Sequence, residues 1–90
     1  MRRIHFRVTG RVQGVGFRAA TERQARRHGL TGFVRNRIDG DVEGEAQGAA
    51  DALDAFSAWL AEGPLFARVR AVDARDLPPV ADEATFDVRR

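Results

Sequence analysis

The sequence contains no cysteine, which excludes disulfide bonds, a thiolate nucleophile and cysteine-ligated zinc. No apolar run approaches the roughly 20 residues that a membrane-spanning helix requires. The first five residues also lack the apolar segment of a signal peptide. We therefore expect a cytoplasmic protein that has no contact with membranes and is stabilised by packing alone.

Lysine is absent as well, so all fifteen basic residues are arginine. Residues 1–38 hold ten arginines and one acid, whereas residues 39–90 hold five arginines and twelve acids. Arginine favours planar, bidentate contacts with phosphate or carboxylate. The basic first half is thus compatible with an anionic ligand, and equally with an arginine-rich surface that only keeps the protein in solution.

The chain has 90 residues, which is enough for one domain and too few for two. Hydrophobic residues make up 43% and charged residues 31%, a composition typical of a globular protein rather than a disordered one. We expect residues 1–90 to form a single domain.

The first 30 residues predict a strand, a loop and a helix. A period-2 alternation of apolar and polar residues, typical of a half-buried strand, includes Ile4, Phe6, Val8 and Val12. Three glycines between positions 10 and 16 interrupt this pattern and predict a loop. Good helix formers then continue without glycine or proline, which predicts a helix over about 18–28, with Gly29 at its C-terminal end.

The rest of the chain predicts a hairpin, a second helix and two further strands. Strands on either side of the Asp39-Gly40 turn form the hairpin. An alanine-rich helix follows over 49–62, ended by Gly63-Pro64. Residues 66–74 predict another strand, Pro78-Pro79 interrupt the chain, and alternation at residues 86–88 predicts a short last strand.

This order of elements, βαββαβ with a short C-terminal strand, predicts an α+β protein. It is the pattern of a ferredoxin-like split βαβ sandwich, an antiparallel sheet with two helices on one face. In that fold the first two strands run parallel, and the third lies between them. The glycine-rich loop after the first strand and Asn36, near the end of the second, can therefore face one pocket.

The glycine-rich loop has the features of an anion-binding site. Its junction with the helix presents unpaired backbone N–H groups, and the helix dipole adds positive potential there. Arg18, in the first helical turn, can add a bidentate guanidinium. A cation at this position opposes the dipole and so requires an offsetting partner such as phosphate. The alternative is that Arg18 points into solvent.

Two nucleotide-binding motifs fit this loop poorly. A P-loop requires Gly-Lys-Ser/Thr, and the chain has no lysine. Residues 14–19 do match the Gly-x-Gly-x-x-Ala dinucleotide fingerprint, and Asp39 follows about 20 residues later. However, Asp39 belongs to an Asp-Gly turn, and 90 residues cannot supply the paired halves of a doubly wound domain.

Two longer segments carry a more specific signal. Residues 10–18 (GRVQGVGFR) resemble the phosphate-loop signature of acylphosphatases, and residues 29–36 (GLTGFVRN) with 39–43 (DGDVE) resemble the family's second signature. Both occur in the expected order, and the similarity extends over nearly the whole chain.

The resemblance implies a hydrolase that cleaves acyl phosphates to carboxylate and inorganic phosphate without a metal ion or other cofactor. Arg18 would bind the phosphoryl group and Asn36 would position the attacking water. Inorganic phosphate would be product and inhibitor. Separately, we expect a monomer, and we expect broad acyl specificity because a short pocket of backbone amides grips phosphate but says little about the acyl group. The phosphate-binding residues implied are Gln13, Gly14, Val15, Gly16, Phe17 and Arg18.

Some residues depart from the family pattern. Ala20 replaces a bulky aromatic and His28 an aliphatic residue, so we expect looser packing of the first helix. His28 lies at the far end of that helix from Arg18 and is interpreted as a hydrogen-bonded packing residue. His5 is expected to be solvated on the outer face of the first strand.

Two other classes of function are considered. Ferredoxin-like domains also bind RNA or anions without catalysis, but an RNA-binding sheet exposes aromatic residues on its central strands. Here Phe6 belongs to the buried phase of its strand and the third strand has no aromatic residue, so we expect no nucleic acid partner. A regulatory domain that has lost catalysis is less compatible with an intact Arg18 and Asn36.

Overall fold

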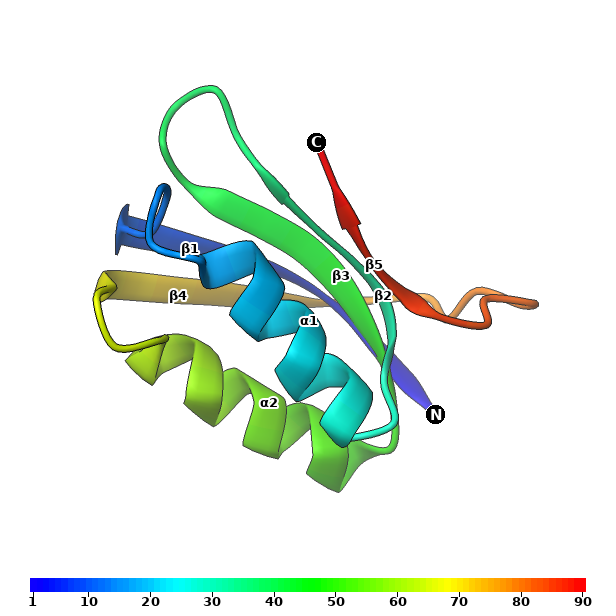
Figure 1. Cartoon of the computed structure of the whole chain (residues 1–90). Helices are drawn as coiled ribbons and strands as arrows, with labels where there is room; N and C mark the ends of the chain where they lie inside the picture. The colour runs from blue at the N-terminus through cyan, green and yellow to red at the C-terminus, as the bar shows by residue number, and fades with distance from the viewer.

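The computed structural model describes residues 1–90. Five strands form one sheet in the order β4-β1-β3-β2-β5, and both helices cover the same face of it (Figure 1). The predicted βαββαβ order and ferredoxin-like architecture are confirmed. The elements are β1 (Arg2–Arg11), α1 (Phe17–Arg27), β2 (Thr31–Asn36), β3 (Val42–Gly48), α2 (Ala50–Glu62), β4 (Arg68–Leu77) and β5 (Phe86–Arg89).

The last strand gives the sheet a mixed character that the sequence did not predict. The other neighbouring strands pair antiparallel, but β5 runs parallel to β2, with Gly32 opposite Phe86. β5 runs in this direction because of the place where β4 ends. Leu77 lies opposite Arg3 at the start of β1, which is also the end of the sheet where β2 begins. The chain crosses to β2 there, and β5 therefore follows the direction of β2.

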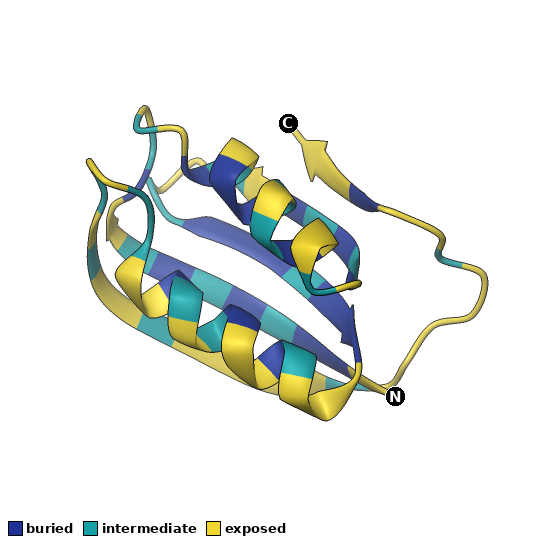
Figure 2. Ribbon diagram, turned by 60° about the horizontal axis from the view of Figure 1, so that its bottom comes forward, coloured by how far each residue is buried: buried dark blue, intermediate teal, exposed yellow.

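The core lies between the helices and the sheet (Figure 2). α2 buries one stripe at helical spacing, Leu53, Phe56 and Leu60. The Phe56 ring packs edge-on against Phe6 of β1, with 5.4 Å between centroids, and against Phe86 of β5 at 6.2 Å. These contacts tie the first and last strands to α2. Neither helix has the length and hydropathy needed to cross a membrane.

Helix α1 starts and ends close to the predicted positions. It ends at Arg27, and His28 is the C-terminal cap, half-buried and at the opposite end from Arg18. Ala20 and Thr21 are buried on the face toward the sheet. The looser packing expected from Ala20 and His28 stays a prediction.

The face of the sheet opposite the helices carries a network of arginines and carboxylates. Arg3 is only 4% exposed, with its Nε 2.7 Å from Glu45 and its Nη1 2.8 Å from Glu83, which belongs to the segment between β4 and β5. His5 Nε2 lies 3.2 Å from Glu43 Oε1, so the prediction that His5 is solvated is wrong. The strand alternation correctly placed these side chains away from the helices, but it could not show that acids of β3 and a later segment cover them.

This network lowers the pKa of two glutamates. Burial raises the pKa of Glu43, but hydrogen bonds from His5, Arg35 and Arg37 outweigh it, and the net pKa is below its ordinary value. The hydrogen bond from Arg3 lowers the pKa of Glu83 in the same direction. Both residues are thus more stable ionised in the folded chain than in the unfolded one.

We predict that these glutamates make the fold acid-sensitive. Their ordinary pKa is 4.5, so their contribution to stability is present above that pH and is lost as the pH falls through the lower folded values. Urea unfolding of Glu43→Gln should show a lower free energy of unfolding at neutral pH and a smaller further loss on acidification than wild type. Glu62→Gln, at an exposed position in α2, is the control. Parallel pH profiles for wild type and Glu43→Gln would contradict the assignment.

Candidate functional site

The loop between β1 and α1 ends in a helix N-terminus with free backbone donors. Gly16 is the N-cap residue in the left-handed conformation, with φ 75° and ψ 20°, and no side chain caps the helix. The N–H groups of residues 14–19 donate to no backbone carbonyl. An added Cβ at Gly16 would meet no atom within 4 Å, so its positive φ rather than crowding favours glycine there. The first turn contains no acid, and its positive potential is not offset locally.

A cavity of about 220 Å³ lies against this loop. It brings together Arg18, from the first turn of α1, and Asn36, the last residue of β2. β1 and β2 flank β3 in the sheet, and this arrangement was the basis for expecting the two residues in one pocket. The full lining is Val12, Gly14, Gly16, Phe17, Arg18, Ala19, Asn36 and Val88.

Arg18 is half-buried and held against the last strand. Its Nη1 donates a hydrogen bond to the carbonyl oxygen of Arg89, at 3.0 Å. A guanidinium has five N–H donors, so this bond leaves further donors for a ligand. The alternative of an Arg18 free in solvent does not fit this contact, and the sequence could not show it because it depends on how β5 pairs.

The side chain of Gln13 has a role that sequence reasoning missed. Its Nε2 donates to the backbone carbonyls of Arg37, at 2.7 Å, and Asp41, at 3.0 Å. These two carbonyls belong to the connection between β2 and β3, directly after Asn36. Gln13 therefore ties the glycine-rich loop to the segment that follows Asn36.

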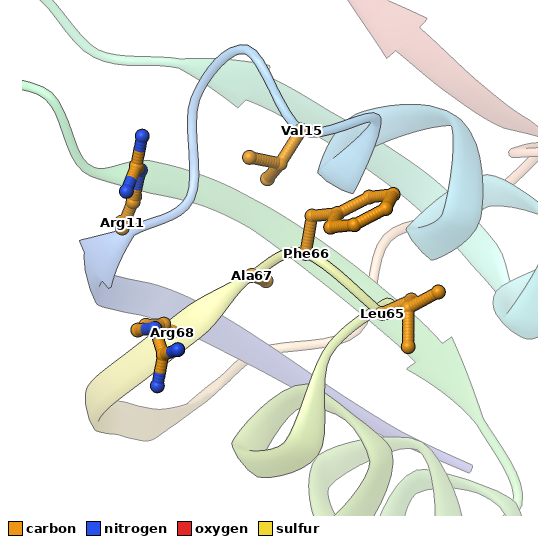
Figure 3. Close-up of a pocket in the computed structure, with 6 residues that line it drawn as sticks. All are labelled: Arg11, Val15, Leu65, Phe66, Ala67 and Arg68. Carbon is orange, nitrogen blue, oxygen red and sulfur yellow. The ribbon is translucent and has the colours of Figure 1, made fainter.

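The predicted loop residues do not all line the same cavity. Gly14, Gly16, Phe17 and Arg18 line the cavity with Asn36, and Gln13 does not. Val15 lines a second cavity, of about 460 Å³, on the side of β4 (Figure 3). Neither placement bears on whether the backbone N–H groups of Gln13 and Val15 bind phosphate.

The fold and site define a ferredoxin-like α+β protein with a cavity at a helix N-terminus that is lined by an arginine and an asparagine. The acylphosphatase family model matches residues 4–88. An acylphosphatase of Methylococcus capsulatus is 47% identical over 100% of this chain and 98% of its own length, and one of Salinibacter ruber is 51% identical over 99% and 94%. The crystal structure of acylphosphatase from Bacillus subtilis matches with a TM-score of 0.96 and 33% identity, covering all of both chains.

The chain therefore belongs to the acylphosphatase family. It is an enzyme whose substrates are small acyl phosphates, which it hydrolyses to a carboxylate and inorganic phosphate.

We predict that the Gln13 side chain is needed to hold the two halves of the site together. Gln13→Ala removes two hydrogen bonds, one to the carbonyl of Arg37 and one to that of Asp41. Each carbonyl keeps one backbone donor, the N–H of Gly40 and of Arg37 respectively. At about 0.5–1.5 kcal/mol for each lost bond, the free energy of unfolding should fall by about 1–3 kcal/mol. Urea unfolding measures this loss. Gln24→Ala, on α1 at a half-buried position, is the matched control and should unfold at or above the wild-type urea concentration, because alanine is the better helix former. A Gln13→Ala protein as stable as wild type would mean that water replaces the amide without cost.

Proposed function

We propose that the cavity shared by Arg18 and Asn36 is the active site. The backbone N–H groups of Gln13, Gly14, Val15, Gly16, Phe17 and Arg18, together with the Arg18 guanidinium, bind the phosphoryl group. The Asn36 amide positions the water that attacks phosphorus. The observation that carries this proposal is that one cavity is lined by the glycine loop, by Arg18 and by Asn36.

Electrostatics support phosphate as the ligand. The start of α1 combines free N–H groups with a guanidinium, and no acid of the first turn offsets their charge. Arg18 at a helix N-terminus is unfavourable alone and becomes favourable when a dianion occupies the cavity. Charge-assisted hydrogen bonds from N–H groups and arginine are also the interactions that stabilise negative charge on a phosphoryl group in the transition state.

The proposed reaction is a single displacement at phosphorus. A bond forms between the water oxygen and phosphorus, and the bond from phosphorus to the carboxyl oxygen breaks. The carboxylate leaves with the electron pair. One water proton passes to a phosphoryl oxygen and the other stays on the attacking oxygen, so the products are a carboxylate and dihydrogen phosphate. A carboxylate is a good leaving group, so positioning and charge stabilisation suffice without a strong protein base.

Asn36 is suited to orient the water because its backbone is fixed. It lies half-buried at the end of β2, opposite Val42 of β3. An amide side chain offers both an acceptor and donors, so it can accept a hydrogen bond from the water and hold its lone pair toward phosphorus. In this proposal the positive charge comes from arginine and backbone N–H groups, and no metal ion takes part.

An RNA-binding function finds less support. Phe6 is buried beneath α2, and Phe33 on the opposite face is covered by the Arg89 guanidinium, 4.0 Å from its ring centroid. Neither ring presents a bare surface for stacking a base. The single-domain organisation, the monomeric state, the cytoplasmic location and the absence of a nucleic acid partner all stay predictions.

We predict that substitutions of Arg18 and Asn36 affect different kinetic constants. With benzoyl phosphate as substrate, Arg18→Ala should raise KM and lower kcat, and should weaken competitive inhibition by inorganic phosphate about ten- to a hundredfold, because a charged hydrogen-bond partner is lost. Asn36→Ala should lower kcat by about 10²–10³ and leave phosphate inhibition within a few-fold of wild type. Steady-state kinetics in the presence of EDTA measure both.

The control is Arg23→Ala, which removes an exposed arginine of α1 that lines none of the cavities. It should keep wild-type kinetics, and all variants should keep the circular dichroism of the fold. A folded Asn36→Ala enzyme with normal kcat and raised KM would make Asn36 a binding contact instead. Activity lost in EDTA and restored by magnesium or zinc would refute the metal-free reaction.

A further inference from the structure

The second cavity, called here the outer pocket, joins apolar and basic side chains next to the glycine loop. Its volume is about 460 Å³, and its lining is Arg11, Val15, Leu65, Phe66, Ala67 and Arg68. Leu65 is 88% and Phe66 74% exposed. Figure 3 shows Val15 above the Phe66 ring, with the two arginines on the side of the pocket away from Leu65. Adjacent large apolar side chains left in water lose the stability that their burial would give.

The two arginines of the outer pocket form an unbalanced pair of positive charges. Arg11 of β1 and Arg68 of β4 are direct cross-strand partners, an arrangement that is unfavourable for like charges. Both are exposed, and neither is within ion-pair distance of a carboxylate, whereas Arg3, Arg7 and Arg35 each have one.

A backbone irregularity creates this pairing. The register shifts between Thr9 and Gly10, and Gly10 has φ 130°. A Cβ at Gly10 would lie 2.1 Å from the Arg68 carbonyl oxygen, so only glycine allows the two strands to approach here. The bulge therefore brings Arg11 and Arg68 opposite each other at the edge of the outer pocket.

The position of the outer pocket relative to Asn36 indicates which part of the substrate the pocket would bind. Asn36 is the last residue of β2, whereas the outer pocket lies at the end of β1 and the start of β4. Strand β3 separates β2 from β1 in the sheet. The glycine loop lies between the outer pocket and the cavity that contains Asn36. Gly14 and Gly16 line the cavity with Asn36, and Val15 lines the outer pocket. In phosphoryl transfer the attacking and leaving oxygens are roughly in line across phosphorus. Water held at Asn36 thus directs the leaving acyl group toward Val15.

We propose that the outer pocket binds the acyl part of the substrate and selects acyl phosphates that carry a second anionic group beyond an apolar or aryl body. Leu65, Phe66 and Val15 contact the body, and Arg11 and Arg68 bind the distal anion. This inference rests on the proposed function, because it takes the direction of the acyl group from the role given to Asn36. It narrows the broad acyl specificity expected from the sequence.

A pair of matched substrates tests the proposal: 4-carboxybenzoyl phosphate and its neutral 4-methoxycarbonyl ester. For each enzyme we take the ratio of kcat/KM for the carboxylate substrate to kcat/KM for the ester. Comparing this carboxylate-to-ester ratio between a variant and wild type removes the difference in intrinsic reactivity of the two substrates. Arg11→Gln and Arg68→Gln should each lower the carboxylate-to-ester ratio about three- to tenfold, and raising the salt concentration should lower it in wild type. Phe66→Ala should lower kcat/KM for both aryl substrates relative to acetyl phosphate by about three- to tenfold.

Arg75→Gln is the matched control, because Arg75 is an exposed arginine toward the other end of β4, outside the outer pocket. It should keep the wild-type ratio. If Arg11→Gln and Arg68→Gln also kept that ratio, the anion site would be refuted. If Phe66→Ala left the aryl-to-acetyl preference unchanged, the apolar part would be refuted. Arg18→Ala separates this inference from the proposed function, since it should lower kcat/KM for all three substrates by the same factor. If it did not, the proposed phosphate site would fail, whatever the substrate ratios.

Discussion

Strand β3 lies between β1 and β2, and this placement fixes the distance between the two parts of the candidate active site. Val42 is the cross-strand partner of Val8 on one side and of Asn36 on the other. Two strand spacings separate Val8 from Asn36, about 10 Å. The chain beyond Val8 finishes β1 at Arg11 and turns back through the glycine loop to Arg18, which lines the cavity with Asn36. Nearly all of β3 is buried, so a register slip would expose core residues as well as displace Asn36.

Charge compensation divides the arginines into two groups. The basic first half of the chain pairs with acids of the second half on the face opposite the helices, as with Arg3 and Glu83 or Arg7 and Asp41. At the edge that carries the loop, Arg11, Arg18 and Arg68 have no carboxylate partner. The arginine excess that the sequence shows in residues 1–38 is therefore partly structural. Of its unpaired members, Arg11 and Arg18 lie beside the two cavities, whereas Arg23 and Arg27 of α1 do not. A surface that balanced its charge everywhere would have no preference for an anionic ligand.

Local sequence patterns predict the elements and the central geometry of the site. Period-2 alternation and glycine punctuation are enough to place β1, α1 and the hairpin, and the βαββαβ order is enough to bring Arg18 near Asn36. The direction of β5, the burial of Arg3 and the hydrogen bond from Arg18 to the Arg89 carbonyl all depend on where residues 78–85 cross the sheet. The apolar-polar periodicity of the sequence does not predict the path of residues 78–85. Gln13 illustrates a second limit, because the two carbonyls it binds belong to an irregular turn whose shape is set only after β2 and β3 have paired.

The central claim is that the loop holds the phosphoryl group while water attacks phosphorus. Single-turnover hydrolysis of benzoyl phosphate in ¹⁸O-labelled water, with mass spectrometry of both products, tests it most directly. Attack at phosphorus puts the label into inorganic phosphate and leaves benzoate unlabelled, and this is the result we expect. Label in benzoate would mean that water attacks the carbonyl carbon, which contradicts the roles given to the loop, Arg18 and Asn36.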